Sequence, residues 1–285
     1  MNSKNIFNML SQDVTCRRST DQLPAMQGKP FHSHDGYEIY LFLNGNVDYY
    51  VEAGGRRLKR GNLILTAPYA FHAAFSQGTD EYDRIVINMR KEYVASLYGR
   101  EDDDLTQCFM ADCALHVLSL TETEISKFVA LTTELEAALN SQPAFGDSVL
   151  AKALLSQILV FINRKVLQNA PSIQQGNIMP LSVSKAIAFV NAHHTIPLTV
   201  SELAKALHYH PDYLNRQFKL ITGVSIQQFL IEKKCTHAKM LLAKGMPPSE
   251  ACLKTGFQNY SNFSRTFSKY VGISPKHYQS LMKNL

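Results

Sequence analysis

The amino-acid sequence predicts an α+β protein, with an N-terminal antiparallel β-barrel, a helical linking segment and a C-terminal all-α domain. Three observations predict this fold class. Short β-rich runs occupy positions 30–90, helical periodicity replaces them after position 91, and the last third of the chain contains one pattern twice. A chain of 285 residues is long enough for two domains with separate cores. We place the boundaries at 1–110, 111–179 and 180–285.

The β-barrel is predicted by four runs rich in β-branched and aromatic residues: Glu38–Leu43, Val47–Val51, Leu63–Thr66 and Arg84–Asn88. Turn residues such as glycine and asparagine separate these runs. Several short strands at this spacing are typical of a small antiparallel barrel or sandwich.

The middle of the chain is predicted to be helical and to end in a linker. After Thr121, apolar residues recur at three- and four-residue spacing, and Val149–Leu167 is apolar on more than one side. Such a helix needs two neighbours, so a homodimer is expected, although packing within one chain explains the pattern equally well. Residues 171–180 have the composition of a linker.

The last third of the chain is predicted to form seven capped helices, the first over Ser184–His193. Thr199 with Glu202 and Ser225 with Gln228 have the capping-box spacing. Pro211 suits the first turn of the third helix. The remaining predicted N-caps are Ser249, Asn259 and Ser274, and the predicted C-terminal glycines are Gly223 and Gly245.

The repeated pattern is Leu214-x-Arg216-x-Phe218-x4-Gly223-x-Ser225-x3-Phe229, which returns 49 residues later between Phe263 and Tyr278. A second match upstream, Glu202 against Glu250, is offset by 48 residues. One structural unit is therefore present twice, and the second copy carries one extra residue between its halves.

In each copy an arginine is predicted to face away from the core. Leu214 and Phe218 share a helix face, while Arg216 stands about 200° round the helix from each of them. Arg265 has the same relation to Phe263 and Phe267. A short helix, a turn and a second helix with an outward polar stripe is the helix-turn-helix pattern, whose second helix enters the DNA major groove. Two helical hairpins with solvated polar faces would show the same periodicity.

Charge favours the DNA interpretation. From Pro180 onward there are 13 Lys+Arg and 4 Asp+Glu, a net charge of +9, whereas the rest of the chain carries −4. Arginine can bind guanine, asparagine can bind adenine, and lysine mostly holds phosphate. The predicted DNA-binding residues are Asp212, Asn215, Arg216, Lys219, Asn259, Ser261, Asn262, Arg265 and Lys269.

Residues 184–281 resemble the double helix-turn-helix domain of the AraC/XylS family of bacterial transcription regulators. The most specific part is Gly256-Phe257-x2-Tyr260-Ser261-x-Phe263-Ser264-Arg265-x-Phe267-x2-Tyr270-x-Gly272-x-Ser274-Pro275-x2-Tyr278. The resemblance implies a sequence-specific DNA-binding regulator, an activator, with promoter or operator DNA as partner and RNA polymerase as a candidate partner. It also implies that Ser225–Leu242 is a rigid spacer. Lys234 departs from the family, which usually has arginine there.

Outside the repeat, the strongest constellation is His32-x-His34-x3-Glu38-x6-Gly45 followed by Gly61 and His72, which resembles the motifs of cupin barrels. His32, His34, Glu38 and Tyr40 have the same parity, so one strand could direct all four inward. The family resemblance implies a pocket for a small-molecule effector, often a sugar. The predicted effector-binding residues are His32, His34, Glu38, Tyr40 and His72.

Two alternatives remain open for this constellation. Three imidazoles and a carboxylate suit a divalent transition metal, which would make His32, His34, Glu38 and His72 ligands. The same residues could also be purely structural. We predict no cofactor and no catalytic residue, and the alternative function is a metal-dependent cupin enzyme with a helical accessory domain. The longest apolar runs are shorter than a membrane span, so we expect a cytoplasmic protein without a membrane partner.

Overall fold

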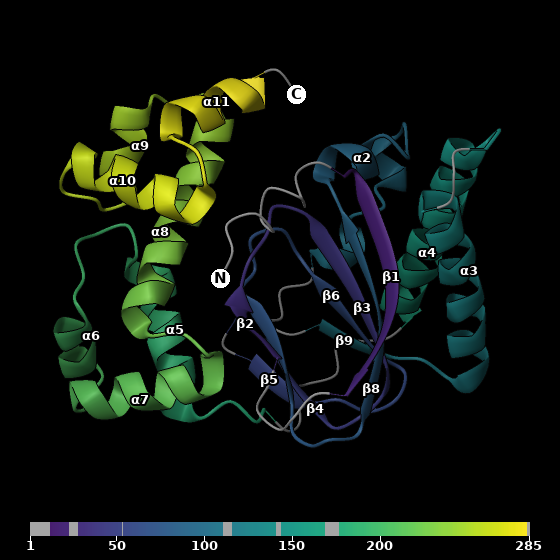
Figure 1. Ribbon diagram of the computed structural model, residues 1–285, viewed down its shortest axis with the longest axis horizontal. Coiled ribbons are helices and arrows are strands. Elements are labelled where there is room, and N and C mark those ends of the chain that lie inside the picture. The colour runs from purple at the N-terminus through teal and green to yellow at the C-terminus, as the bar shows by residue number, and fades with distance from the viewer. Residues whose placement is uncertain are drawn as a thin grey trace. The chain divides into compact units, whose positions relative to one another are not determined.

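The computed structural model describes residues 12–22, 28–52, 54–110, 116–140, 144–168 and 177–283. The chain divides into two compact units, of which one spans Gln12–Ile178 and the other includes Met179–Leu285 (Figure 1). The predicted α+β class is confirmed, with strands in the first unit and helices throughout the second. Most of the predicted linker lies outside the described residues.

The strands of the first unit form two antiparallel sheets. The five-stranded sheet has the order β1 (Val14–Gln22), β8 (Glu81–Met89), β3 (Tyr37–Asn44), β6 (Asn62–Thr66) and β9 (His116–Ser119). The four-stranded sheet has the order β2 (Gly28–His32), β7 (His72–Ser76), β4 (Val47–Val51) and β5 (Gly54–Arg57). The four predicted strands are present as β3, β4, β6 and β8. Among the described strands no ladder joins the two sheets, so the predicted closed barrel is wrong.

Strand β3 contributes to two separate cores. Ile39 and Leu41 face the helical side of the five-stranded sheet, where they join Ile85 and Ile87 of β8. Tyr40 and Phe42 point to the other face and pack with residues of β4 between the sheets. Both faces are covered, so β3 is buried from Tyr37 to Leu43. Glu38 shares the parity of Tyr40, which directs its carboxylate into the space between the sheets.

Two long helices, α3 (Glu122–Asn140) and α4 (Asp147–Gln168), lie along the outer face of the five-stranded sheet (Figure 1). Between β8 and β9 the chain forms the short elements α2 (Lys91–Ala95), η1 (Glu101–Asp103) and η2 (Gln107–Phe109). The buried side chains of α4 belong to the same core as those of β3 and α3. The predicted apolar helix therefore packs within its own chain over much of its surface.

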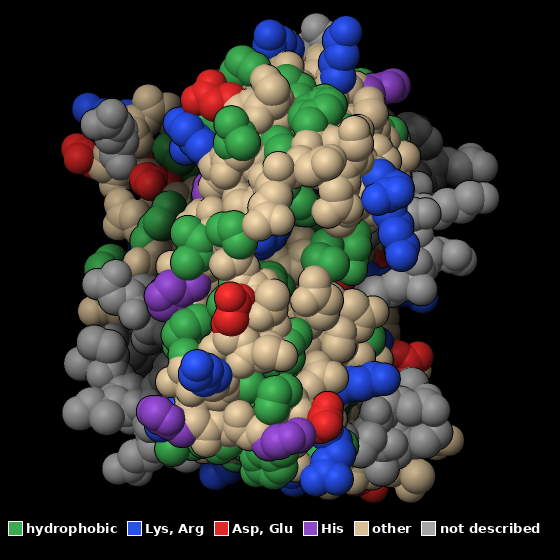
Figure 2. Space-filling view, turned by 90° about the vertical axis from the view of Figure 1, so that its left-hand side faces the viewer, with side chains coloured by type: hydrophobic (Ala, Val, Ile, Leu, Met, Phe, Trp, Pro, Cys, Tyr) green, Lys and Arg blue, Asp and Glu red, His purple; other side chains and the backbone are tan. Residues whose placement is uncertain are grey.

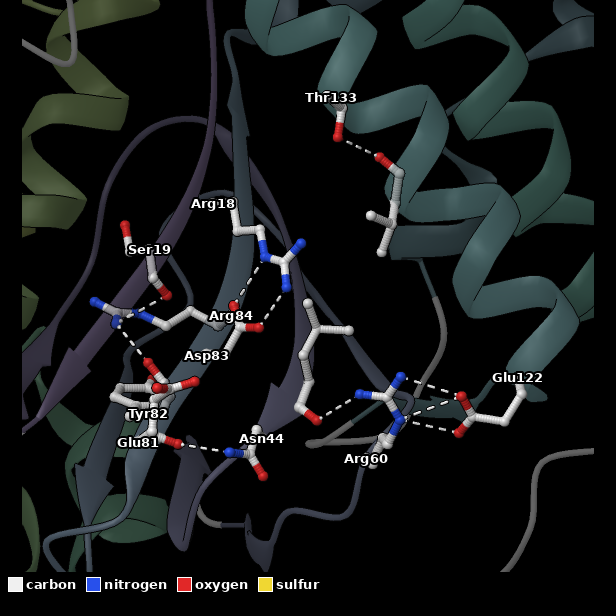
Figure 3. A network of polar contacts seen from close by, with 12 residues as sticks. Arg18, Ser19, Asn44, Arg60, Glu81, Tyr82, Asp83, Arg84, Glu122 and Thr133 are labelled. Carbon is white, nitrogen blue, oxygen red and sulfur yellow. Dashed lines mark hydrogen bonds and ion pairs between the residues drawn. The ribbon is translucent and has the colours of Figure 1, made fainter.

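Ion pairs tie the sheet to its helical cover (Figure 3). Arg60 Nε donates to Glu122 Oε1 at 3.0 Å, at the start of α3, and Arg60 Nη1 donates to the carbonyl of Leu43 at 3.0 Å. Within the sheet, Arg18 Nη2 of β1 donates to Asp83 Oδ2 of β8 at 2.6 Å. The arginines of both pairs are about half exposed, so each pair contributes little to the free energy of unfolding.

The described residues of the second unit form seven helices: α5 (Leu181–His193), α6 (Val200–Ala206), α7 (Pro211–Thr222), α8 (Ile226–Ala243), α9 (Pro248–Lys254), α10 (Tyr260–Val271) and α11 (Pro275–Lys283). Both predicted capping boxes are present, and Gly223 closes α7 in the left-handed conformation. Asn259 caps α10 as predicted. The prediction of Ser249 as an N-cap is wrong, because Pro248 occupies the first turn of α9 and Ser249 lies inside it.

Helix α8 contributes to both halves of the second unit. Near its start, Phe229 packs against Phe218 of α7, with ring centroids 5.3 Å apart. Towards its end, Ala238 and Leu242 join the core formed by α9, α10 and α11. Among the residues that the structure describes, none of the helices is both long and apolar enough to cross a bilayer.

Candidate DNA-binding surface and ligand site

The helix pairs α6–α7 and α9–α10 are built in the same way. Each turn contains a residue in the left-handed region, His208 (φ 61°) in the first pair and Gly256 (φ 72°) in the second. The amide that follows donates back to the first helix, from Tyr209 to Ala204 at 2.9 Å and from Phe257 to Cys252 at 3.2 Å. Each of these residues in the second pair lies 48 positions after its counterpart in the first pair. The core residues of α10 lie 49 positions after those of α7. The extra residue of the second copy therefore lies between the left-handed residue and α10.

The second helix of each pair buries its apolar side and exposes its arginine. Leu214 and Phe218 in α7 are fully buried, as are Phe263 and Phe267 in α10. Of the predicted DNA-binding residues, those exposed to solvent are Asp212, Arg216, Lys219, Asn259, Ser261, Asn262, Arg265 and Lys269. The two helices thus present similar polar stripes.

Asn215 is the exception, because it is only partly exposed and its side chain is used inside the fold. Its Oδ1 accepts a hydrogen bond from the Ile226 amide at 3.1 Å, in the first turn of α8. Asn259 has a comparable local role, since its Oδ1 accepts from the Asn262 amide at 2.9 Å. Both asparagines keep their NH2 groups as donors.

From Pro180 onward, four acidic residues offset only part of the charge of 13 lysines and arginines. Glu202 accepts hydrogen bonds from Thr199, which lower the pKa of its carboxyl, and Glu250 pairs with Lys254 at 3.2 Å. Burial raises the pKa of Glu232 to about 7. Figure 2 shows Lys and Arg side chains spread over the face of this unit, with few acidic side chains between them. Such a surface attracts a polyanion.

In the first unit, the predicted effector-binding residues come from both sheets. His32 ends β2, His34 lies in the connection to β3, and His72 begins β7, whereas Glu38 and Tyr40 are on β3. The prediction that one strand could direct His32, His34, Glu38 and Tyr40 inward is wrong, because the chain passes from one sheet to the other between His32 and Tyr37. The imidazoles nevertheless meet, with the His72 ring centroid 4.3 Å from that of His32 and 5.1 Å from that of His34.

Backbone carbonyls orient all three imidazoles. The Nδ1 atoms lie 2.9 Å from the Pro30 oxygen for His32, and 3.0 Å from the oxygens of Gly36 and Ala70 for His34 and His72. A carbonyl oxygen only accepts, so each Nδ1 carries hydrogen. The Nε2 atoms of His34 and His72 then point at Glu38, each 3.4 Å from one of its carboxylate oxygens.

The electrostatics of this cluster favour a charged Glu38. Burial raises the pKa of the Glu38 carboxyl, but the positive charge of His72 and His34 in their protonated forms outweighs burial and holds the pKa well below its usual range. Burial lowers the pKa of His32, and His72 beside it lowers that pKa further. Glu38 is therefore a carboxylate surrounded by buried imidazoles.

Two family models cover most of the chain. Residues 20–159 match the model described as the AraC-like ligand binding domain, and residues 203–280 match the model of a helix-turn-helix domain. The chain belongs to the AraC family of transcription regulators. It is accordingly a DNA-binding transcription regulator with an AraC-like ligand-binding domain.

Relatives within the AraC family match along nearly the whole chain. The uncharacterized HTH-type transcriptional regulator YobQ of Bacillus subtilis is 25% identical, with 95% of each chain covered. The melibiose operon regulatory protein of Escherichia coli is 27% identical, over 88% of this chain and 83% of that protein. Among solved structures, ToxT of Vibrio cholerae with a bound unsaturated fatty acid is 14% identical, with a TM-score of 0.42 and coverage of 95% and 97%.

In this AraC-family chain, the cluster of His34, Glu38 and His72 also fits a metal ion, which the resemblance to the cupin motif implies. The ligand atoms of His34, Glu38 and His72 lie within 4.8 Å of one another, and all three residues are buried. His32 lies outside this group of three, and the Tyr40 hydroxyl instead shares a short hydrogen bond with Tyr82. If a metal is bound, it would be held by the Nε2 atoms of His34 and His72 and the Glu38 carboxylate.

Sequence reasoning missed Tyr49, whose hydroxyl donates to Glu38 Oε1 at 3.1 Å. Burial, with Glu38 close by, raises the pKa of Tyr49 well above its usual value, so the phenol stays a donor. The alternation of β4 could have indicated that Val47, Tyr49 and Val51 share the inner face, but not that Tyr49 meets Glu38.

Proposed function

We propose that the protein activates transcription from promoter or operator DNA and that a small molecule, a sugar, controls it by binding in the first unit. In this proposal residues 1–110 bind the effector, 111–179 link and dimerise, and 180–285 bind DNA. The observation that carries the proposal is the pair of outward arginine stripes on α7 and α10, within a chain that also contains a buried polar cluster. The protein would act in the cytoplasm, where it meets DNA and, as a candidate partner, RNA polymerase.

On the DNA side, we propose that α7 and α10 are the recognition helices. Arg216 and Arg265 occupy equivalent exposed positions, and each guanidinium is suited to bind guanine O6 and N7. Lys219 and Lys269, one turn further along, are suited to phosphate. The other predicted contacts are Asp212, Asn215, Asn259, Ser261 and Asn262.

Binding to the DNA upstream of the protein's own gene tests this assignment. We expect Arg216→Ala with Arg265→Ala to weaken binding at least about tenfold and to reduce its dependence on salt concentration. Arg164→Ala, which removes an exposed arginine from α4, is the matched control and should bind like the wild type. Unchanged affinity and salt dependence in the double variant would contradict the proposal.

On the effector side, we propose that His32, His34, Glu38, Tyr40 and His72 bind the small molecule. Imidazoles and a carboxylate can hydrogen-bond to several hydroxyl groups, as sugar recognition requires. A sugar is further supported by the relative named as the melibiose operon regulatory protein. The existing cluster is compact, so we expect side chains to move apart when the effector binds.

A thermal-shift screen of sugars on the full chain tests the effector. We expect a mono- or disaccharide to raise the unfolding temperature of the wild type and to change its affinity for upstream DNA. His32→Ala should lose both responses and keep DNA binding. A screen in which only non-sugar ligands stabilise the protein would overturn the sugar assignment and leave the DNA assignment standing.

We also propose a homodimer, formed by the helical segment. Val149 and Leu150 near the start of α4 and Leu167 near its end are exposed although apolar. Sedimentation equilibrium should give twice the chain mass of 32.0 kDa. A monomer throughout the micromolar range would contradict this.

A further inference from the structure

In the buried cluster of His34, Glu38 and His72, hydrogen-bond acceptors outnumber the donors that face them. Because Nδ1 of each imidazole donates to a backbone carbonyl, each Nε2 of a neutral ring carries a lone pair. Both Nε2 atoms are buried without a hydrogen-bond partner and face the Glu38 carboxylate, which also only accepts. Acceptors that face one another in a buried site require extra protons or a cation between them.

The distances favour a cation. Each Nε2 lies 3.4 Å from a Glu38 oxygen, whereas an N–H···O hydrogen bond usually spans about 2.7–3.2 Å. Two ligand atoms at about 2.1 Å from a zinc ion, separated by a tetrahedral angle, lie about 3.4 Å apart. Both Nε2–carboxylate separations therefore match metal ligands better than hydrogen-bonded partners, and all three ligand atoms lie within 4.8 Å of one another.

We propose that His34, Glu38 and His72 bind one divalent transition-metal ion, zinc or a metal with similar ligand preference. Two imidazoles and one carboxylate form a set of nitrogen and oxygen donors that leaves a coordination position for water or for a ligand oxygen. The carbonyls of Gly36 and Ala70 and the hydroxyl of Tyr49 supply the outer hydrogen bonds that orient such ligands. The proposal does not depend on a sugar effector or on DNA binding.

Zinc content tests the site directly. We expect the full chain, stripped with EDTA and dialysed against Zn2+, to hold one zinc ion per chain. His34→Gln and His72→Gln should each weaken zinc binding by more than about tenfold, since each removes a ligand atom. Phe42→Leu is the matched control, because it alters a buried residue on the same face of β3 and removes no ligand. Wild-type protein without zinc, or histidine variants that keep it, would overturn the proposal.

Titration with Co2+ tests the site in the wild-type protein, without any variant. Co2+ added to the stripped wild-type protein is expected to produce visible absorption bands, which one equivalent of Zn2+ should abolish. Protein that binds neither ion would show that shared protons balance the cluster, and the metal proposal would fall. A sugar response or DNA binding could persist in that case, so the proposals fail separately.

A separate observation concerns Lys234, in the middle of α8. Its Nζ donates to the carbonyl oxygen of Gly256 at 2.8 Å and to that of Ile196 at 3.3 Å. Ile196 lies in the loop between α5 and α6, which leads into the first helix pair, and Gly256 lies in the turn of the second pair. Lys234 is only 7% exposed, although its side chain ends in a charged group. One buried ammonium thus connects the loop that leads into the first helix pair to the turn of the second pair.

We infer that Lys234 is a positioning residue, which fixes α7 relative to α10 and thereby the spacing of the two DNA half-sites that one chain contacts. A buried ammonium keeps its partners in place because each lost hydrogen bond would leave a charge or a carbonyl unsatisfied. Helix α10 directly follows the turn at Gly256, and the loop at Ile196 leads through α6 to α7, so a shift between loop and turn changes the distance between α7 and α10. This inference rests on DNA contact by both α7 and α10.

Hydroxyl-radical footprinting on the upstream DNA tests this role. We expect Lys234→Met to weaken binding at least about tenfold and to lose protection of one half-site while the other remains. Lys234→Arg should restore both, and Lys244→Met, which removes an exposed charge at the end of α8, should change neither. A methionine variant that protects both half-sites like the wild type, or that loses both together while folded, would overturn the inference. If the double variant Arg216→Ala, Arg265→Ala binds DNA like the wild type, the proposed DNA contact by α7 and α10 is wrong, which is a different outcome from failure of the Lys234 inference alone.

Discussion

Gly256 stands directly against the backbone of Thr195. A Cβ atom at position 256 would lie 2.7 Å from both the carbonyl carbon and the carbonyl oxygen of Thr195. The φ of Gly256 is +72°, in the region that favours glycine. A side chain is therefore excluded here by the neighbouring loop and by the backbone conformation together. The contact joins the turn of the second helix pair to the loop between α5 and α6.

Gly256→Ala should therefore destabilise the protein more than a glycine replacement with backbone strain alone. Gly245 is the matched control, because its φ is +88° and a Cβ atom there would meet nothing within 4 Å. We expect Gly245→Ala to lower the unfolding free energy by about 1–2 kcal/mol, and Gly256→Ala to lower it by at least about 1 kcal/mol more. Urea unfolding of the full chain measures both. Equal losses would show that the loop moves away from Gly256 freely.

Substitutions at Asn215 should separate stability from DNA binding. Asn215→Asp keeps an acceptor for the Ile226 amide and should retain wild-type stability, whereas Asn215→Leu should lose about 1 kcal/mol. Both lose the amide NH2 that is proposed to face DNA, so both should weaken binding to upstream DNA. Thermal unfolding and fluorescence anisotropy measure the two effects. Wild-type affinity in the aspartate variant would restrict Asn215 to its structural role.

Glu232 should make stability depend on pH. Burial raises the pKa of this carboxyl from 4.5 to about 7, so the folded state binds more protons than the unfolded chain between these values. The unfolding free energy therefore falls as the pH rises through this window. Glu232→Gln should remove that fall and be more stable than the wild type at pH 8, by at most about 3 kcal/mol.

Urea unfolding at several pH values between 4.5 and 8 measures this difference. Glu250→Gln, which removes an exposed carboxyl from the same unit, is the control and should leave the slope unchanged. A wild-type protein whose stability rises over this range, with Glu232→Gln showing the same rise, would contradict the assignment.

The elements that the sequence predicted well are those with local signals. Capping boxes at Thr199 and Ser225 and the left-handed Gly223 mark helix ends through contacts a few residues apart. The prediction missed β1, β2, β5, β7 and β9. Strand β1 lies at a sheet edge and exposes Arg17 and Arg18, so it lacks an apolar pattern. The closed barrel was wrong because strand signals do not indicate which edges pair.

In the candidate sites, too, local features could be predicted from the sequence and long-range contacts could not. The sequence by itself determined that Arg216 and Arg265 face away from their cores, because the positions on one helix follow from its periodicity. It also predicted that His32, His34 and His72 accompany Glu38, and the structure brings His34 and His72 to the carboxylate. Only the tertiary structure decided that His34 and His72 aim their Nε2 atoms at that carboxylate, and that Lys234 reaches both the α5–α6 loop and the turn of the second helix pair. Those contacts join residues far apart in the chain, so they depend on how sheets and helices pack rather than on any local pattern.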